Sequence, residues 1–261
     1  HGVQKDKKHL IICCTTMPEY CDSLQEKLSP YNYTVSYNPE FIAQGNILND
    51  QAYPDMVLIG QANKEVGDIV QEHYEKMTMN TPKICRMSRT QAELTKLSLN
   101  CFLTTKIAFA NMVGDIAIAS GVDPNPVLAA VGNDTRVGPK YLRYGFGYGG
   151  PCFPRDNRAL GIFARDKGQL ALISAASDDS NALHLSFQVE KFIDENPKDT
   201  PVVITDVTYK PGTSIIEESQ QLKFAVRLAQ AGYKVTIRER REVIEKINKQ
   251  YAQIPFRYEE V

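Results

Sequence analysis

The sequence predicts an α/β protein built on a doubly wound parallel sheet, with a long central helix and part of a second, smaller α/β unit. Short apolar runs alternate with amphipathic segments early in the chain, a pattern typical of strands followed by helices. One long segment has apolar side chains at helical spacing, and a strand–helix–strand pattern follows later. These observations divide the 261 residues into expected domains at 1–88, 89–196 and 197–261.

The first sheet is predicted from four apolar runs, at residues 9–16, 33–37, 56–60 and 83–87. Amphipathic segments at 19–28 and 64–77 are the expected helices between them. Ligands of such sheets lie beyond the carboxyl ends of the strands. Thr16 and Glu40 follow the first two runs, so we expect both at a binding edge.

The central helix is predicted over residues 91–120, and Gly121 is a plausible residue to end it. Its apolar side chains cover much of the circumference, so the helix should be buried on several sides and could form a dimer contact. Lys96 and Asn100 are four residues apart and therefore share one face.

The remaining elements follow in order. A short helix is expected at 124–132, and a polar loop at 133–138 leads into a glycine run. Residues 170–195 are expected to be helical, with a break in the small polar portion at 174–179. Strands at 202–205 and 234–237, with helices at 219–230 and 242–251, would begin a second α/β domain.

The most informative stretch is residues 145–156, which read G-F-G-Y-G-G-P-C-F-P-R-D. Pro154 suits the first turn of a helix, so Cys152 should lie at a helix N-terminus, where the thiolate is favoured. Asp156, four residues on, can share its face. The sequence therefore predicts a covalent active site. The alternative is that Cys152 is a small buried apolar residue, as many lone cysteines are.

The glycines of this run also fit the dinucleotide pattern G-x-G-x-x-G, at Gly145, Gly147 and Gly150. That pattern requires a hydrophobic strand before it, and residues 141–144 make a poor strand. We therefore reject this run as the cofactor site.

Composition excludes several classes of function. The net charge is −1 and no long basic run occurs, so neither nucleic acid nor an anionic membrane is an expected partner. No uncharged stretch approaches the roughly 18 to 20 residues of a membrane span, and the polar first residues do not resemble a signal peptide. The six cysteines lack C-x-x-C spacing, so we expect no metal site, no disulfide framework and a cytoplasmic location.

Five segments resemble motifs of the UDP-glucose/GDP-mannose dehydrogenase family. They are T-T-M-P at 15–18, similar to S-T-x-P; N-P-E-F-I-A-Q-G at 38–45, similar to N-P-E-F-L-x-E-G; E-L-T-K-L-S-L-N at 93–100, similar to E-L-x-K-x-x-x-N; D-T-R-V-G at 134–138, similar to D-x-R-I-G; and G-Y-G-G-P-C-F-P-R-D at 147–156, similar to G-F-G-G-S-C-F-P-K-D. The sequence around Cys152 is closer to the family's UDP-glucose branch than to its sugar-N-acetyl branch. The resemblance covers residues 9 to about 170.

The resemblance implies an enzyme that oxidises the C6 alcohol of a nucleotide sugar to a carboxylate in two hydride transfers to NAD. Cys152 would attack the intermediate aldehyde and carry the thioester. Lys96 and Asp156 would polarise the C6 oxygen or position water, and Asn100 would help hold the oxyanion. The other implied catalytic residues, which would handle proton transfer and water, are Glu40 and Thr16.

The resemblance also implies binding residues and partners. Residues implied for the nucleotide-sugar site are Phe41, Ile42, Arg136, Tyr141, Leu142, Arg143, Gly149 and Lys210. Arg136 would act across a homodimer. Residues implied for the cofactor site are Thr16, Gln44 and Arg155. Residues 1–88 would then be the C-terminal half of an NAD-binding Rossmann-like domain, and 197–261 part of a UDP-binding Rossmann-like domain.

The sequence departs from the family pattern in three places. The glycine fingerprint expected about a hundred residues before Thr16 is absent from the sequence, so we expect a fragment that binds NAD poorly. Residues 215–219 read I-I-E-E-S where the family has D-x-R-E-S, which places Glu217 at the position of an arginine that meets the cofactor. Gln44 replaces a glutamate and cannot act as a base.

Three functions therefore remain open. The first is a nucleotide-sugar 6-dehydrogenase, with UDP-glucose as the expected substrate. The second is a non-catalytic nucleotide-sugar-binding homologue that has lost NAD. The third is a hydroxyacid-type dehydrogenase with an incidental cysteine, which would form one NADH per substrate rather than two.

Overall fold

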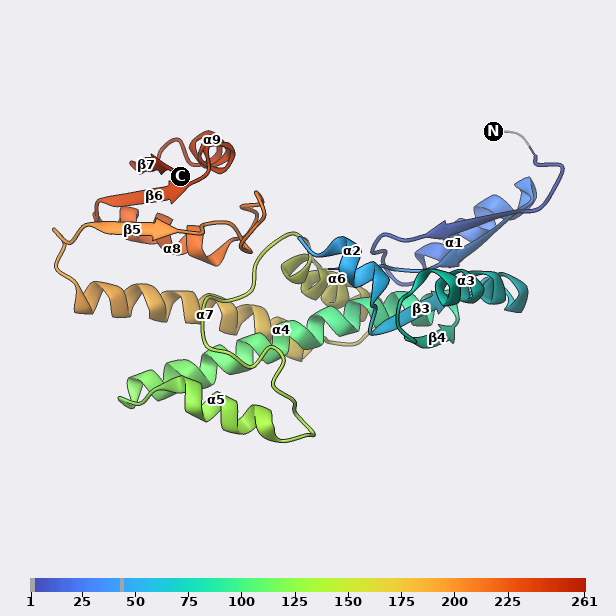
Figure 1. Cartoon of the computed structure of the whole chain (residues 1–261), viewed down its shortest axis with the longest axis horizontal. Helices are drawn as coiled ribbons and strands as arrows, with labels where there is room; N and C mark the ends of the chain where they lie inside the picture. Colours follow the sequence, from blue (N-terminus) through green and yellow to red (C-terminus); the bar gives the residue numbers. More distant parts are fainter. Residues whose placement is uncertain (1–2, 43–44) are drawn as a thin grey trace. The chain divides into compact units, whose positions relative to one another are not determined.

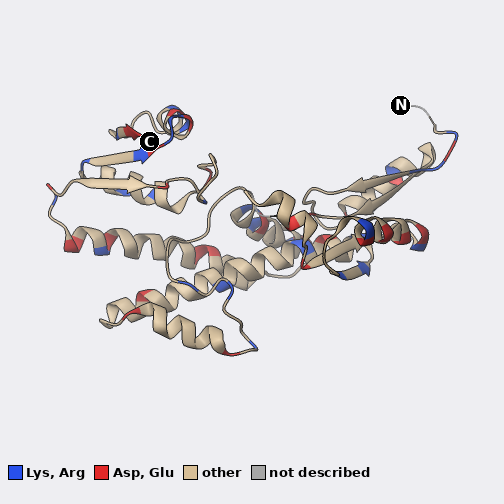
Figure 2. Cartoon of the chain, in the orientation of Figure 1, with Lys and Arg blue, Asp and Glu red and all other residues tan. Residues whose placement is uncertain are grey.

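The computed structural model describes residues 3–42 and 45–261, which form two compact units, residues 1–99 and 100–261 (Figure 1). Gln44, an expected cofactor residue, lies outside the described residues. Basic and acidic residues are interspersed along most elements, in keeping with the net charge of −1 (Figure 2).

The sheet of the first unit contains β1 (Lys8–Ile12), β2 (Tyr33–Tyr37), β3 (Met56–Gly60) and β4 (Lys83–Met87), in that order. β1 pairs with β2 and β3 with β4 in parallel, as predicted, and one antiparallel bridge between Tyr37 and Gly60 joins the two pairs. The first strand ends at Ile12, earlier than expected, so Thr16 lies in the turn after it. β1 lies at the edge of the sheet and is largely exposed, not buried as its apolar sequence suggested.

Helices cover both faces of this sheet. Side chains alternate along a strand, so Leu58 faces one side of β3, where it packs with Cys21 of α1 (Tyr20–Leu28). Val57 and Ile59 face the other side, where they pack with α3 (Lys64–Met77). The α3 bounds agree with the prediction. A 3-10 turn η1 (Ser29–Tyr31) and a short helix α2 (Ile47–Ala52) complete this unit.

The predicted central helix is α4 (Arg89–Ala119), whose first residues belong to the first unit and whose remainder belongs to the second. Among the described residues, α4 is long and apolar enough by length and composition to cross a membrane, although the charges of Lys106 and Asp115 fall within its apolar part. A core helix of a soluble protein meets the same criterion. Gly114 lets the Tyr144 ring lie against α4, because a Cβ there would come within 2.0 Å of it.

The second unit adds α5 (Pro124–Asn133), α6 (Phe153–Asp166) and α7 (Leu172–Glu195). The break expected at 174–179 is wrong, since α7 is one continuous helix (Figure 1). Ser174 and Ser177 are buried there: Ser177 donates to the Ile173 carbonyl, and its hydroxyl lies 3.0 Å from that of Thr105. Tertiary partners therefore satisfy residues that in isolation disfavour a helix.

The second sheet contains β5 (Val202–Thr205), β6 (Val235–Glu239) and β7 (Arg257–Glu260), all parallel and in that order. It packs with α8 (Gln220–Gln230) and α9 (Arg241–Gln250) around the largest apolar cluster, which includes Val207, Leu228 and Ile237. The expected β-α-β pattern is therefore present. The sequence did not indicate β7, because its residues are charged or aromatic and mostly exposed, as at a sheet edge.

Candidate active site

In the first unit, Lys96 holds the segment that follows β2. Its ammonium donates a 2.6 Å hydrogen bond to the Glu40 carbonyl and lies 4.3 Å from the centroid of the Phe41 ring. The side chain is buried, so the carbonyl and the ring face replace part of its hydration. Three residues from the predicted site, Glu40, Phe41 and Lys96, are thus brought together.

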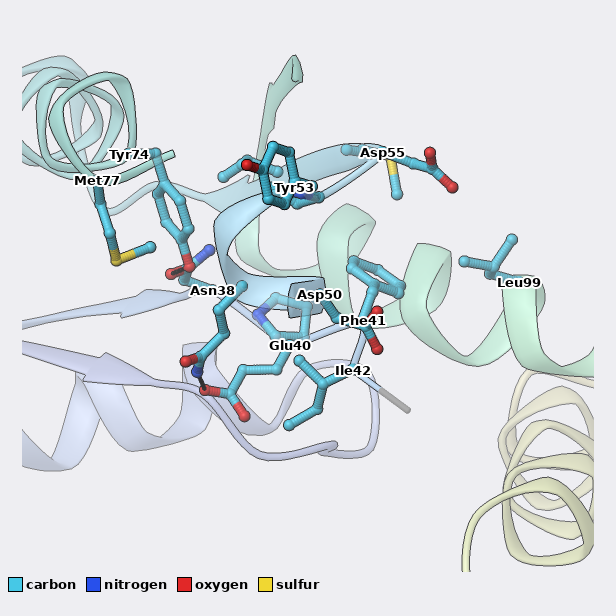
Figure 3. A pocket seen from close by; sticks show the side chains of 15 residues that line it. Asn38, Glu40, Phe41, Ile42, Asp50, Tyr53, Asp55, Tyr74, Met77 and Leu99 are labelled. Atoms are coloured by element: carbon cyan, nitrogen blue, oxygen red, sulfur yellow. Dashed lines mark hydrogen bonds between the residues drawn. The ribbon is translucent and has the colours of Figure 1, made fainter. Parts of the chain in front are cut away.

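Glu40 and Phe41 also line a cavity of about 350 Å³ (Figure 3). Its described lining includes the carboxylates Glu40, Asp50 and Asp55 and contains no lysine or arginine. The Tyr74 hydroxyl donates to Asn38 across one wall, at 2.8 Å. This combination of acidic, amide and aromatic groups is chemically suited to hydroxyl groups and disfavours a phosphate.

Thr16 is hydrogen-bonded to Glu93 of α4, a residue that was not predicted to belong to the site. This fully buried carboxylate accepts from the Thr16 hydroxyl at 3.0 Å and from the backbone N–H groups of Glu19 and Cys21 at 2.8 and 2.9 Å. α1 has no side-chain cap of its own, so Glu93 supplies it from another helix. Since Thr16 donates to Glu93, its oxygen remains able to accept from water or a substrate hydroxyl.

The sequence marked Glu93 only as the first residue of the motif that contains Lys96 and Asn100. Its role depends on Thr16, Glu19 and Cys21, which lie more than 70 residues away in the chain. Tyr37 is buried beside this group, and that burial raises the pKa of Tyr37 to about 12. Its phenol therefore stays protonated at neutral pH.

In the second unit, Cys152 lies at the N-cap of α6, and its thiol belongs to an exposed residue. Its carbonyl accepts the first hydrogen bond of the helix, from the Asp156 N–H at 2.8 Å. Burial, with a smaller contribution from the nearby Cys152 side chain, raises the pKa of Tyr209. The predicted position of the cysteine at a helix start is confirmed.

Arg155 supplies positive charge at this position. Partial burial of its guanidinium favours the neutral form, but hydrogen bonds and charges from Asp156 and Cys152 outweigh it and raise the pKa of Arg155. The side chain donates to Asp156 at 2.9 Å. A helix N-terminus and a guanidinium therefore both lie beside the Cys152 sulfur.

The Asp156 carboxylate is fully buried and bonded on both oxygens. Asn100 of α4 donates to one oxygen at 2.6 Å, while Arg155 donates to the other. Behind this pair, the Cys101 thiol donates to the Asp156 carbonyl at 3.5 Å. Burial raises the pKa of Cys101 to about 11, so this thiol is structural where that of Cys152 is accessible.

The glycines before Cys152 lie against residues 209–219. A Cβ at Gly149 would come within 2.3 Å of the Glu218 carbonyl, and one at Gly150 within 2.4 Å of the Tyr209 ring. The Gly150 N–H donates to the Glu217 carbonyl at 3.0 Å. Glu217 thus uses its backbone to hold the run, while its side chain belongs to an exposed residue.

The other predicted binding residues are distributed as follows. Lys210 follows Tyr209, which contacts the glycine run, whereas Ile42 lines the cavity of the first unit. Leu142 packs with Ala110 and Leu128 in a core cluster. Exposed residues of the loops before Cys152 are Arg136, which pairs with Asp134, and Tyr141 and Arg143.

Comparisons with known proteins give the following matches. Residues 3–78 match the NAD binding domain of the UDP-glucose/GDP-mannose dehydrogenase family, and residues 90–182 match its central domain. The chain is 32% identical over 228 residues to a UDP-glucose 6-dehydrogenase of Rickettsia bellii, covering 85% of this chain and 52% of that protein. A UDP-glucose 6-dehydrogenase of Pseudomonas aeruginosa is 31% identical over 215 residues, covering 81% and 48%.

Among solved structures, a UDP-glucose dehydrogenase from the hyperthermophilic archaeon Pyrobaculum islandicum superposes with a TM-score of 0.88 at 28% identity, covering 98% of this chain and 60% of that one. The α/β fold with a long central helix is therefore shared. The chain spans about half the length of the curated relatives it matches.

Proposed function

The chain belongs to the UDP-glucose/GDP-mannose dehydrogenase family. From this premise we propose that it is part of a nucleotide-sugar 6-dehydrogenase and supplies the catalytic thiol. The observation that supports this most strongly is Cys152 at the N-cap of α6, beside Arg155 and the bonded pair Asn100–Asp156. We propose UDP-glucose as the substrate because the sequence from Pro151 to Asp156 resembles that branch of the family, and because the matched relatives bear that name.

The proposed chemistry begins with an aldehyde at C6 of the sugar. The Cys152 thiolate adds to the carbonyl carbon, forming a C–S bond and an oxyanion. Loss of hydride from that carbon leaves a thioester, and water then releases the carboxylate and restores the thiol. NAD, when bound, accepts the hydride in each of the two oxidations.

The other predicted catalytic residues are proposed to manage charge and protons. Asn100 has a second amide hydrogen beyond the one given to Asp156, and this can bond the oxyanion. Lys96, whose buried ammonium donates to the Glu40 carbonyl, would polarise the C6 oxygen. Glu40 would take a proton from the alcohol or water, and Thr16 would accept a hydrogen bond from that water.

The residues fit only part of NAD. Thr16 and Arg155 are suited to the carboxamide at the nicotinamide end, since Thr16 offers an acceptor and the Arg155 guanidinium offers donors. The described cavity of the first unit offers no cation to a pyrophosphate. We therefore assign no residue of this chain to the phosphates.

The acidic groups favour a second candidate, a nucleotide-sugar-binding homologue without catalysis. The exposed Glu217 stands where the family has an arginine for the cofactor, and it would repel a nearby phosphate. Calorimetry separates the two candidates. The enzyme should bind both UDP-glucose and NAD, whereas the binding protein should bind UDP-glucose alone.

The direct test is NADH formation with UDP-glucose by the full-length protein, because this chain spans about half the length of its relatives. We expect two NADH per sugar, loss of product in Cys152→Ala, and near-normal activity in the matched control Cys14→Ser, which changes another exposed cysteine. A stoichiometry of one NADH, or glucuronate formation at the normal rate by Cys152→Ala, would show the assignment to be wrong.

We also propose a cytoplasmic homodimer that contacts through α4, with domain boundaries at 88–89 and 196–197. Phe102, Phe109 and Ile116 recur at seven-residue spacing on the second-unit part of α4, and their exposed fractions are 63%, 44% and 60%. Arg136 would act across this dimer. Sedimentation at micromolar concentration should show a dimer that Ile116→Glu converts to monomer, and a wild-type monomer would contradict the proposal.

A further inference from the structure

The polar residues of α7 are arranged along one face of the helix. Asp178, Asn181 and His184 recur at three-residue spacing, and Gln188 follows four residues later. Asn181, His184 and Gln188 bond to backbone groups of the glycine run. Asp178 bonds to the Tyr148 hydroxyl within that run. We call these four residues the α7 seam.

Asn181, in the middle of the α7 seam, binds the backbone of the glycine run. Asn181 accepts from the Tyr148 N–H and donates to the Tyr148 carbonyl, both at 3.0 Å. A Cβ at Gly147 would come within 2.1 Å of the Asn181 carboxamide oxygen, so the contact requires glycine there. This paired bond fixes the path of the chain four residues before Cys152.

Asp178 connects the same tyrosine to the helix that Cys152 caps. It accepts from the Tyr148 hydroxyl and, at 3.0 Å, from the Asn157 amide of α6. Burial and the Asp178 charge raise the pKa of Tyr148, which keeps its phenol a donor. The run and the start of α6 therefore share one acceptor on α7.

His184 holds the beginning of the run. Its Nδ1 lies 2.8 and 2.9 Å from the two carboxylate oxygens of Asp115, and its Nε2 lies 2.7 Å from the Gly145 carbonyl. The Gly145 carbonyl can only accept, so Nε2 donates to it, and the ring bridges Asp115 and the start of the run. The His184 side chain is 1% exposed, so this bridge lies inside the unit.

The surroundings of the ring are consistent with this. The titratable groups facing it among the described residues are Asp115 from α4 and Tyr144, whose ring meets the imidazole edge-on at 5.4 Å and whose hydroxyl also donates to Asp115. The Gly145 N–H donates to the Asn111 carboxamide at 3.1 Å. Both backbone groups of Gly145 are thus fixed by buried side chains.

We propose that the α7 seam sets the position of the Cys152 thiol, and that His184, whose ring bridges Asp115 and Gly145, is the positioning residue at the start of the glycine run. The inference rests on the placement of Cys152 and not on the identity of the substrate. Failure of the UDP-glucose assay would leave it standing, and its own failure would leave the assay result standing.

The test measures the reactivity of Cys152 in the whole chain. Iodoacetamide labelling, resolved by peptide mass spectrometry, gives the rate at Cys152 with Cys14 as an internal reference. Loss of one charge-assisted hydrogen bond corresponds to about tenfold. We therefore expect His184→Phe to slow labelling of Cys152 by about that factor with no change at Cys14. His184→Gln restores one donor and should recover most of the rate.

Two further outcomes decide the proposal. If His184→Phe unfolds at the wild-type temperature and Cys152 reacts at the wild-type rate, the seam does not position the thiol. The bridge is also measured on the wild-type chain and so does not depend on the folding of any variant. Nitrogen-15 NMR should show a proton on Nε2 of His184, as a donor to the Gly145 carbonyl requires, and a ring protonated at Nδ1 alone would overturn the bridge.

Discussion

The segments that carry Cys152 and Glu40 are held in different ways. The run before Cys152 is bonded through backbone groups of Gly145, Tyr148 and Gly150, largely by buried side chains of α7 and α4. Glu40 is held by its carbonyl through Lys96, and its exposed carboxylate has a 3.4 Å contact with Gln51 beside an open cavity.

The difference follows from what each group has to do. A nucleophile reacts faster when it is fixed near its attacking position, because the entropy cost of orienting it is then met during folding and not during the reaction. A proton acceptor beside a cavity can adjust to the substrate that fills it. The contrast predicts that changes around Cys152 affect both stability and activity, whereas changes at Glu40 affect activity alone.

The largest expected effect is at Gly147. In Gly147→Ala the new Cβ would meet the Asn181 oxygen at 2.1 Å, which breaks the paired bond to Tyr148. We expect a loss of about 3 kcal/mol in the free energy of unfolding, typical of overpacking combined with a lost buried bond. Urea denaturation measures this.

Gly145→Ala is the matched control, because a Cβ there would meet nothing within 4 Å. It should stay within about 1 kcal/mol of wild type. Equal losses in the two variants would mean that the run is not held at Gly147 in particular.

The next effect compares two glutamates of the first unit. Glu93→Gln leaves a backbone N–H of Glu19 or Cys21 facing an amide N–H, whichever way the new amide turns. We expect a loss of about 2 kcal/mol in unfolding free energy. Glu40→Gln, on an exposed side chain, should change stability by less than about 0.5 kcal/mol while abolishing proton transfer.

Thermal unfolding and NADH formation, measured on both glutamine variants, check this pair. A Glu40→Gln protein as destabilised as Glu93→Gln would remove the contrast between a fixed and an adjustable segment.

A smaller effect is expected at Asn100, whose amide supports Asp156. Asn100→Ala leaves one oxygen of a buried carboxylate without its 2.6 Å donor, which costs about 1 to 2 kcal/mol. Asn125→Ala removes an exposed asparagine that bonds Asp123 and should cost under about 0.5 kcal/mol. Chemical denaturation of both gives the comparison, and a neutral Asn100→Ala would show that Asp156 does not depend on this bond.

The smallest effect is a pH dependence from the buried thiol behind Asp156. The folded-state pKa of Cys101 is raised from 9.0 to about 11, so the folded state binds its proton more tightly than the unfolded state. The resulting stability is complete below pH 9 and is lost as pH rises towards 11. The slope of unfolding free energy against pH in that window should be shallower in Cys101→Ala than in wild type, and equal slopes would contradict the raised pKa.

Local sequence patterns predicted most of the fold. Apolar runs located β2, β3 and β4, and the amphipathic period located α3 and α4. The errors occur where distant partners decide the structure. Residues 174–179 resemble a helix break, but Ser177 is bonded in place inside α7. The charged strand β7 forms because it pairs with β6, which its own residues do not indicate.

The same contrast between local patterns and distant partners applies to the candidate site. The position of Cys152 at a helix start could be predicted, since a proline follows it within the first turn. The roles of Glu93 and His184 could not, because each depends on partners more than 35 residues away in the chain, such as Gly145 for His184. Pattern analysis finds groups that act alone or with sequence neighbours, and it misses those that position them.

The most direct test of the account is to find the bond that Cys152 is proposed to form. Protein quenched during turnover with UDP-glucose and NAD, then digested and analysed by mass spectrometry, should carry the oxidised sugar nucleotide on the peptide containing Cys152 and on no other cysteine peptide. Turnover with Cys152 unmodified at every time point, or with the adduct on another cysteine, would contradict it.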